Sequence, residues 1–188
     1  MIRDIIWTIV DEIREVLINI DEDQLSVFAG RLNRAQRIFV YGEGRSGLMG
    51  KAFAMRLMHG GYQVFVVGET ITPSIREGDL LVLVSGSGST SSIYNFAVKA
   101  KEVGAQIGLI TANLESNVTN ISDFLLIIPA ATKYRLSHEP RTIQPLGNQF
   151  DQSVHIVLDA LVLYALKDKN NLDIDINEAL RKQHANLE

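Results

Sequence analysis

The sequence predicts an α/β fold, a three-layer α/β/α sandwich built around a parallel sheet. Five short runs rich in Val, Ile and Leu show no polar alternation, as in strands that are buried on both faces. These runs span residues 37–41, 63–67, 80–84, 106–110 and 124–128. Helical segments or short connections separate them, and such alternation indicates βαβ crossovers. A chain of 188 residues fits one domain, and we expect residues 1–188 to form it.

The N-terminal part, residues 1–34, is expected to hold two helices. Apolar residues recur at helical spacing in the first helix and form a stripe wider than one core face requires: Ile2, Ile5, Ile6, Trp7, Ile9, Val10, Ile13, Val16, Leu17 and Ile20. This helix either covers its own sheet or also packs against another subunit. Asp21 or Asp23 caps the second helix, which runs to about Asn33.

Residues 35–130 form the predicted sheet with its crossovers: helices at 46–59 and 90–103, a short connection around Pro73 and a helical turn near 115–121. The part from 131 to 188 begins with a polar loop that reaches Gly147, and long loops in compact domains are often functional. A long apolar helix at about 149–167 follows. The polar tail is expected to hold a short helix near 177–183.

Composition excludes several function classes. The net charge of −4 provides no electrostatic basis for binding nucleic acid. There is no cysteine, so disulfides and thiolate chemistry are excluded, and the four histidines never form a His-x-x-x-His pair, so no metal site is expected. Charged residues interrupt the apolar N-terminus, and no apolar run reaches the length of a membrane span. We therefore expect a cytoplasmic protein with no membrane partner.

The first candidate binding loop spans residues 42–47 and follows the first strand. It reads G-x-G-x-x-G, and its glycines allow backbone N–H groups to approach an anion at the start of a helix. Ser46 adds a hydroxyl group to this loop. A dinucleotide site is the competing interpretation, because Glu69 lies near the end of the second strand, where a ribose-binding acid would sit.

The second candidate loop follows the third strand and favours a phosphate monoester. Six consecutive small residues include four with hydroxyl groups, namely Ser85, Ser87, Ser89 and Thr90. Hydroxyl and helix N-terminal N–H donors that converge on one point form the shell a phosphate dianion requires. The alternative is a flexible turn in which Ser89 or Thr90 is an ordinary N-cap. Neither loop contains a lysine, so a P-loop nucleotide site is not expected.

These stretches resemble a known family. The Ser85–Thr90 segment is similar to the phosphate loop of the SIS (sugar isomerase) domain, and the Gly42–Gly47 loop is similar to its first ligand loop. Further stretches resemble 6-phospho-3-hexuloisomerases over nearly the whole chain: Arg45–Met49, Ala54–His59, Thr142–Gly147 leading to Phe150, and His184–Glu188.

The resemblance implies a five-stranded parallel SIS sheet of the flavodoxin- or Rossmann-like type and an isomerase activity. The implied reaction interconverts 3-hexulose 6-phosphate and fructose 6-phosphate through an enediol, next to 3-hexulose-6-phosphate synthase in the ribulose monophosphate pathway of formaldehyde fixation. The resemblance also implies a homo-oligomer, generally a tetramer, and no metal or organic cofactor. It assigns substrate contacts to Gly44, Arg45 and Ser46 in addition to the hydroxyl-rich loop.

The resemblance further implies two catalytic residues. The family usually carries Glu after the Phe that matches Phe150, as the proposed base, whereas this chain has Asp151, which is one methylene shorter. Asp151 is expected at the start of a helix, where the dipole would keep it ionised. His184 is expected to serve as an acid/base partner, in its own subunit or a neighbouring one.

Three other functions stay open at this point. Other SIS isomerases act on different sugar phosphates, and SIS domains also serve as ligand-binding halves of transcriptional regulators. A sugar-phosphate sensor without turnover is therefore one alternative. A small nicotinamide-binding protein is another, based on the G-x-G-x-x-G loop alone.

Overall fold

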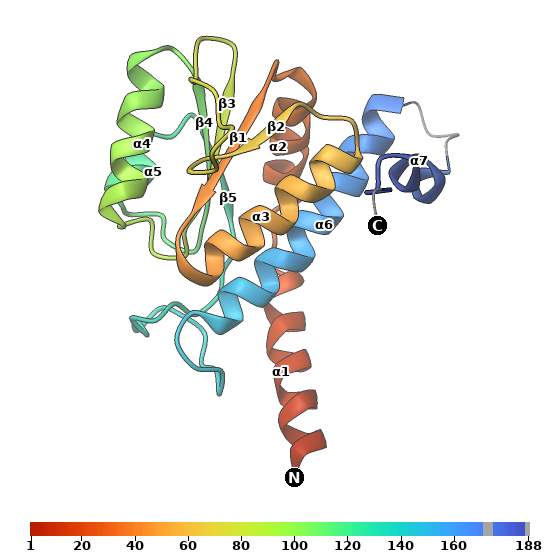
Figure 1. The fold of residues 1–188 in the computed structure, drawn as a ribbon. Coiled ribbons are helices and arrows are strands. Elements are labelled where there is room, and N and C mark those ends of the chain that lie inside the picture. The colour runs from red at the N-terminus through yellow and green to blue at the C-terminus, as the bar shows by residue number, and fades with distance from the viewer. Residues whose placement is uncertain (171–174, 187–188) are drawn as a thin grey trace.

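The computed structural model describes residues 1–170 and 175–186. Its strands form a five-stranded parallel sheet in the order β2-β1-β3-β4-β5 (Figure 1). The strands are β1 (Ile38–Gly42), β2 (Val64–Val66), β3 (Leu80–Val84), β4 (Gln106–Thr111) and β5 (Phe124–Ile127). This is the flavodoxin-like strand order, and the predicted three-layer α/β/α class is confirmed.

Helices cover both faces of the sheet. They are α1 (Ile2–Leu17), α2 (Glu22–Arg34), α3 (Gly44–His59), α4 (Ser91–Glu102), α5 (Asn117–Ile121), α6 (Asn148–Asn170) and α7 (Ile176–Lys182). One apolar cluster joins α2, α3 and α6 to the sheet, and a second joins α4 and α5 to the opposite face. Alternate residues of β3 enter the two clusters: Leu80, Val82 and Val84 face the first, whereas Leu81 and Leu83 face the second.

The sequence-based element boundaries differ from the observed ones by a few residues. Helix α3 begins at Gly44, two residues before the predicted start, and Gly44 adopts a φ of +56°, which glycine takes readily. Asp21, not Asp23, caps α2, since its side chain accepts hydrogen bonds from the amides of Asp23 and Gln24.

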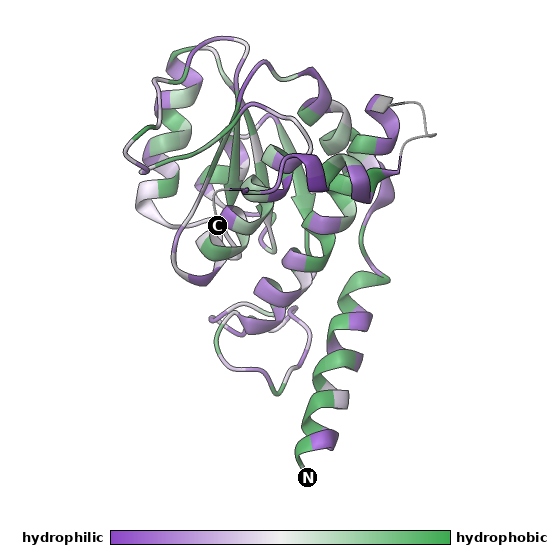
Figure 2. Ribbon diagram, turned by 45° about the vertical axis from the view of Figure 1, so that its right-hand side comes forward, coloured by the Kyte–Doolittle hydropathy of each residue, from purple (hydrophilic) through white to green (hydrophobic). Residues whose placement is uncertain are grey.

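Helix α1 projects away from the sheet and exposes an apolar face (Figure 2). Its inner residues Ile13 and Val16 are buried, and α1 contacts α6. Toward the N-terminus, Ile6 and Trp7 keep 52% and 64% of their surfaces exposed. Helix α1 therefore covers its own chain over only part of its length and leaves an apolar surface exposed.

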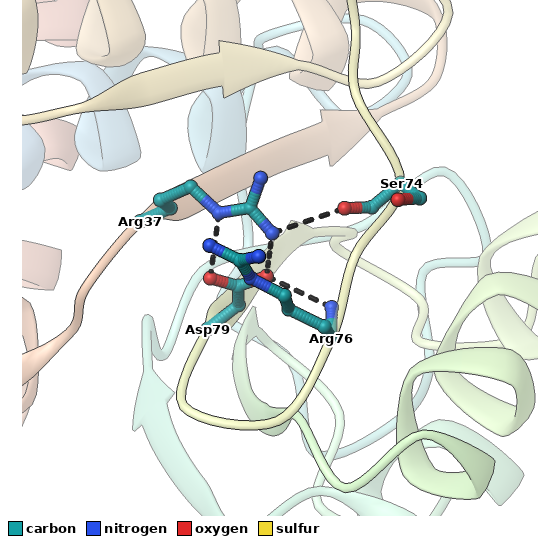
Figure 3. A network of polar contacts seen from close by, with 4 residues as sticks. All are labelled: Arg37, Ser74, Arg76 and Asp79. Carbon is teal, nitrogen blue, oxygen red and sulfur yellow. Dashed lines mark hydrogen bonds and ion pairs between the residues drawn. The ribbon is translucent and has the colours of Figure 1, made fainter.

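The connection between β2 and β3 contains no helix, and a buried ion pair holds it against the sheet. Asp79 is fully buried and accepts hydrogen bonds from Arg37 Nε at 2.9 Å and Nη2 at 2.6 Å (Figure 3). Asp79 also accepts from the amide of Arg76, and Arg37 donates to the carbonyl of Ser74. Arg37 precedes β1 and Asp79 precedes β3, so this network stabilises the amino-terminal edge of the sheet.

No helix among the described residues is long and apolar enough to cross a membrane. Leu187 and Glu188, the last residues of the terminal motif that resembles the family, lie outside the described residues.

Candidate active site

A polar hollow lies at the carboxyl ends of β1 and β3. These neighbouring strands pair Gly42 with Val84, so the loops that follow them lie side by side. The chain leaves β1 toward one edge of the sheet and β3 toward the other, which makes this a topological switch point, where open α/β sheets bind ligands. The hollow has a volume of about 330 Å³. Its walls come from both candidate loops, from the 130–147 loop and from the first turn of α6.

The first loop is compact because its glycines touch backbone. A Cβ atom on Gly47 would lie 2.4 Å from the carbonyl oxygen of Gly42, and one on Gly42 would lie 2.8 Å from that of Val84. Such contacts are too close for any side chain. Packing between β1, β3 and α3 therefore explains Gly42 and Gly47, whereas Gly44 has open space around it and adopts a φ of +56°. This packing brings Gly44, Arg45 and Ser46 to the hollow, as predicted.

The second loop supplies hydroxyl groups to the same hollow. Ser85, Ser87 and Thr90 line it, as predicted. Thr90 is the N-cap residue of α4, yet its side chain makes no capping hydrogen bond. Thr90 therefore does not act as an ordinary side-chain N-cap of α4.

The hydroxyls of this loop are not equivalent. Ser85 is buried, and its Oγ accepts a hydrogen bond from the amide of Gly88 at 3.1 Å, which closes the turn. Ser89 is not among the lining residues of the hollow, but its Oγ donates to Ser87 Oγ at 3.0 Å. Ser89 thus orients the hydroxyl of Ser87 from outside the lining of the hollow. Ser87 and Thr90 carry the hydroxyl groups best placed to contact a ligand in the hollow.

Asp151 lies in the first turn of α6 and faces the hollow with 6% of its surface exposed. Ser46 Oγ donates to Asp151 Oδ1 at 2.7 Å, and Arg45 Nε lies 3.9 Å from Oδ2. The proton of Ser46 therefore points at the carboxylate rather than at a phosphate. The sequence predicted Arg45 and Ser46 as ligand-binding residues, and the structure adds that both orient Asp151.

Burial raises the pKa of Asp151, and this effect outweighs the hydrogen bond from Ser46 and the charge of Arg45, which lower it. That the helix start keeps Asp151 ionised stays a prediction, and burial is an opposing effect on its pKa that the sequence did not reveal. A carboxylate with a raised pKa binds a proton more strongly, and a group that must take and return a proton benefits from that change.

His184 lies far from Asp151 within one chain. Its ring stacks on that of His59, with centroids 5.3 Å apart. His59 ends α3, whereas Gly44 at the hollow begins it, and this span of helix is about 22 Å long. The structure thus does not place His184 with the other predicted site residues of the same chain. Burial lowers the pKa of His59, as do the nearby charges of Arg56 and His184.

Two charged lining residues were missed by the sequence analysis. Lys133 lines the hollow from the start of the 130–147 loop, and its ammonium group lies 5.1 Å from the centre of the Tyr134 ring. Glu43 lines the other side and accepts hydrogen bonds from the hydroxyls of Tyr41 and Ser92. The position of Lys133 in the sequence could have indicated a role at the site, because it follows closely after β5 in the polar loop that was expected to be functional.

Glu69, His155 and Asp159 lie outside the hollow's lining. Glu69 forms an ion pair with Lys51 at 2.7 Å, so its carboxylate is engaged on the surface. His155 lies 3.9 Å from Asp159 on exposed turns of α6, which agrees with a structural pairing. No group of three or more His, Asp or Glu side chains that could hold a metal ion occurs among residues 1–170 and 175–186.

Comparisons with known proteins agree with this geometry. The model of the SIS domain family matches residues 31–142. A 3-hexulose-6-phosphate isomerase of Bacillus subtilis is 38% identical over 180 residues, which cover 96% of this chain and 95% of that protein. A 3-hexulose-6-phosphate isomerase of Mycobacterium gastri is 41% identical over 179 residues, which cover 95% of this chain and 87% of that protein.

A solved structure agrees as well. The crystal structure of a Methanococcus jannaschii protein, from which a molecular function of 3-hexulose-6-phosphate isomerase was inferred, superposes with a TM-score of 0.81 and 33% identity. The match covers 97% of this chain and 98% of that one. The family model covers more than half of the chain, and the relatives match nearly all of it. The chain therefore belongs to the SIS domain family, in the group of the 3-hexulose-6-phosphate isomerases.

Proposed function

We propose that this protein interconverts 3-hexulose 6-phosphate and fructose 6-phosphate, with Asp151 as the group that moves the proton between carbons. The observation that carries the proposal is the buried Asp151 carboxylate, set beside a hydroxyl-rich loop in one hollow. The relatives named 3-hexulose-6-phosphate isomerase support the choice of substrate. In this proposal residues 1–188 act as one unit in the cytoplasm, downstream of a 3-hexulose-6-phosphate synthase, without a cofactor.

The proposed mechanism uses one carboxylate twice. Asp151 removes the proton from C2 of 3-hexulose 6-phosphate, and the electron pair forms the enediolate as the C3 carbonyl gains negative charge. A proton then passes from the O2 hydroxyl to the O3 oxyanion, and the carboxyl returns the carbon-bound proton to C3 as the carbonyl forms at C2. Arg45, 3.9 Å from Asp151, places positive charge where the enediolate develops.

The phosphate is proposed to bind at the 85–90 loop. Ser87 and Thr90 donate from their hydroxyls, and the N-terminus of α4 favours the negative charge. Lys133 adds a second cation to that of Arg45, and Ser85 and Ser89 shape the turn. Gly44 has no Cβ atom, so its backbone can approach the ligand closely.

An assay of the purified protein tests the function. 3-Hexulose 6-phosphate is generated from formaldehyde and ribulose 5-phosphate by a synthase, and formation of fructose 6-phosphate is coupled to NADPH. We expect turnover, and we expect Ser87→Ala to raise KM about tenfold with a smaller change in kcat, since one hydrogen bond to a charged ligand is lost. Ser91→Ala is the matched control, because Ser91 lies in the same segment outside the hollow's lining.

Absence of turnover would contradict the proposal, and calorimetry would then separate the alternatives. Binding of fructose 6-phosphate without turnover identifies a sensor or an enzyme weakened by the shorter carboxylate, and Asp151→Glu distinguishes these two. A change in NADH fluorescence on titration would instead favour the nicotinamide-binding alternative.

We also propose that the protein is a homo-oligomer, a tetramer as in the resembling family, assembled through the exposed face of α1. Ile6 and Trp7 are more than half exposed on a helix that contacts the rest of its own chain mainly through α6. A second copy that covers this face would remove the apolar surface from water. His184 would then serve a neighbouring subunit's site rather than its own.

Substitution on the exposed face of α1 tests the assembly. Ile6→Lys is expected to lower the oligomer mass measured by sedimentation velocity, because it places a charge in an apolar interface. Thr8→Lys, at an exposed polar position of the same helix, should leave the mass unchanged. An Ile6→Lys protein with the parent's mass would show that this face is not the interface.

A further inference from the structure

One carboxylate on α1 holds the loop that forms a wall of the active site. The amide of Ile143 donates to Glu12 Oε1 at 2.7 Å. Thr142 Oγ1 and Gln144 Nε2 donate to Oε2 at 2.5 Å and 3.0 Å. Three consecutive residues of a segment without helix or strand are thus bound to one side chain of a distant helix.

The main chain of Glu12 makes a second connection through Gln149. This buried glutamine donates from Nε2 to the carbonyl of Glu12 at 3.4 Å, and its Oε1 accepts from the amide of Ala131 at 2.7 Å. Ala131 begins the loop, and Gln149 belongs to the first turn of α6. Glu12 therefore connects helix α1 to both ends of the loop and to α6, the helix that carries Asp151.

The connection extends from Glu12 to the residues that line the hollow. Arg135 donates to the carbonyl of Thr132 at 2.8 Å and also to the carbonyl of Gln144, so it crosses the loop. Thr132 lines the hollow at one end of the loop, and Leu146 lines it at the other. Any shift of residues 142–144 is thus passed to both ends of this wall.

Backbone strain shows that the loop needs such support. Arg135 and Leu146 both have a φ of +51°, a left-handed conformation that is unfavourable for residues with a side chain. Strained residues persist where surrounding contacts determine their position. The described loop forms no strand pairing. Glu139 within the loop accepts three hydrogen bonds, from Thr132 and Leu136, and the Glu12 carboxylate accepts three more from outside it.

The charge on Glu12 suits this role. Burial raises the pKa of Glu12, but hydrogen bonds from Thr142, Gln144 and Ile143 together with the charge of Arg135 outweigh it, so the pKa is lowered. An ionised carboxylate accepts these bonds more strongly than a neutral group does.

We propose that Glu12 is a positioning residue for the isomerase reaction: it holds residues 142–144 so that Thr132, Lys133 and Leu146 form the substrate-binding wall. The inference rests on the proposed function. Asp151 is oriented separately, by Ser46 and Arg45. Loss of the Glu12 contacts should therefore weaken substrate binding more than it slows the chemical step.

Glu12→Gln tests the proposal with little change in shape. Two readouts are used: KM and kcat for 3-hexulose 6-phosphate, and hydrogen exchange of the amides from Ile143 to Gly147. We expect KM to rise on the order of tenfold with kcat changed much less, and the loop amides to exchange at least about tenfold faster, since charge-assisted bonds are lost. Amides of β3, which is fully buried, should keep their parent rates.

The control is Glu15→Gln, which makes the same chemical change at an exposed position one turn away. It should alter neither readout. Unchanged loop exchange in Glu12→Gln would overturn the proposal, and so would faster exchange with an unchanged KM. If the β3 amides also exchange faster in Glu12→Gln, the protein as a whole is destabilised, and Thr142→Val is the second test. It removes one hydrogen bond to Glu12 from the loop side, and the proposal requires that its KM rises while its β3 amides keep their parent exchange rates. A parent protein without turnover disproves the proposed function, and the exchange rates still test whether Glu12 holds residues 142–144.

Discussion

Asp151→Asn is expected to lower kcat by about a thousandfold while the protein stays folded. An amide cannot accept the carbon-bound proton, and general base catalysis contributes factors on the order of 10² to 10⁴. The amide oxygen can still accept the hydrogen bond from Ser46, so the local geometry should persist. The coupled assay gives kcat, and circular dichroism checks the fold.

Asp151→Glu is the matched control for this substitution. It keeps the carboxylate and restores the length that the resembling family usually has, so it should retain at least the parent turnover. An Asp151→Asn protein with parent-like kcat would show that another group is the base, and His184 would be the next candidate.

The same variant should change how stability depends on pH. The ordinary pKa of Asp151 is 3.8, and the folded protein raises it. The folded state then binds this proton more tightly than the unfolded state, so the carboxyl contributes most to stability below pH 3.8 and progressively less as pH rises through the folded pKa. Asn has no such proton. In urea unfolding at several pH values, Asp151→Asn should therefore gain stability relative to the parent as pH rises over this window.

Asp79→Ala is expected to have the largest effect on stability. Asp79 is fully buried and accepts three hydrogen bonds, two from Arg37 and one from the amide of Arg76. Its removal leaves a guanidinium and an amide without their acceptor, and we expect the free energy of unfolding to fall by about 2–3 kcal/mol. The midpoint of thermal unfolding should fall by about 5–10 °C for a chain of this size.

Glu77→Ala controls for a lost carboxylate in the same connection, since Glu77 is exposed. It should change stability by less than about 0.5 kcal/mol. Equal losses in the two variants would show that the network in Figure 3 contributes little. Because Arg37 and Asp79 lie at the amino-terminal edge of the sheet, kcat of Asp79→Ala below its unfolding temperature should match that of the parent.

Local patterns were sufficient for most of the fold. Val82 and its neighbours form an uninterrupted apolar run, and such a run can only be buried on both faces, which predicts a parallel central strand. The hydroxyl-rich Ser85–Thr90 segment directly after that run predicts a binding loop at the carboxyl edge. The parallel central strand is confirmed, because the deciding interactions act between residues that are close in the sequence. The binding role of the loop stays a prediction.

The sequence also determined, without the structure, that Asp151 follows the polar loop at a helix start and that α1 carries more apolar surface than its own core needs. Tertiary structure decided the rest. Ser46 meets Asp151, Glu12 meets Thr142, and Arg37 meets Asp79 across 105, 130 and 42 residues of chain. No periodicity encodes such separations. It is likewise the packing of α6 against α3 that buries the Asp151 carboxyl and raises its pKa, because desolvation depends on the atoms gathered around a group and not on its neighbours in the chain.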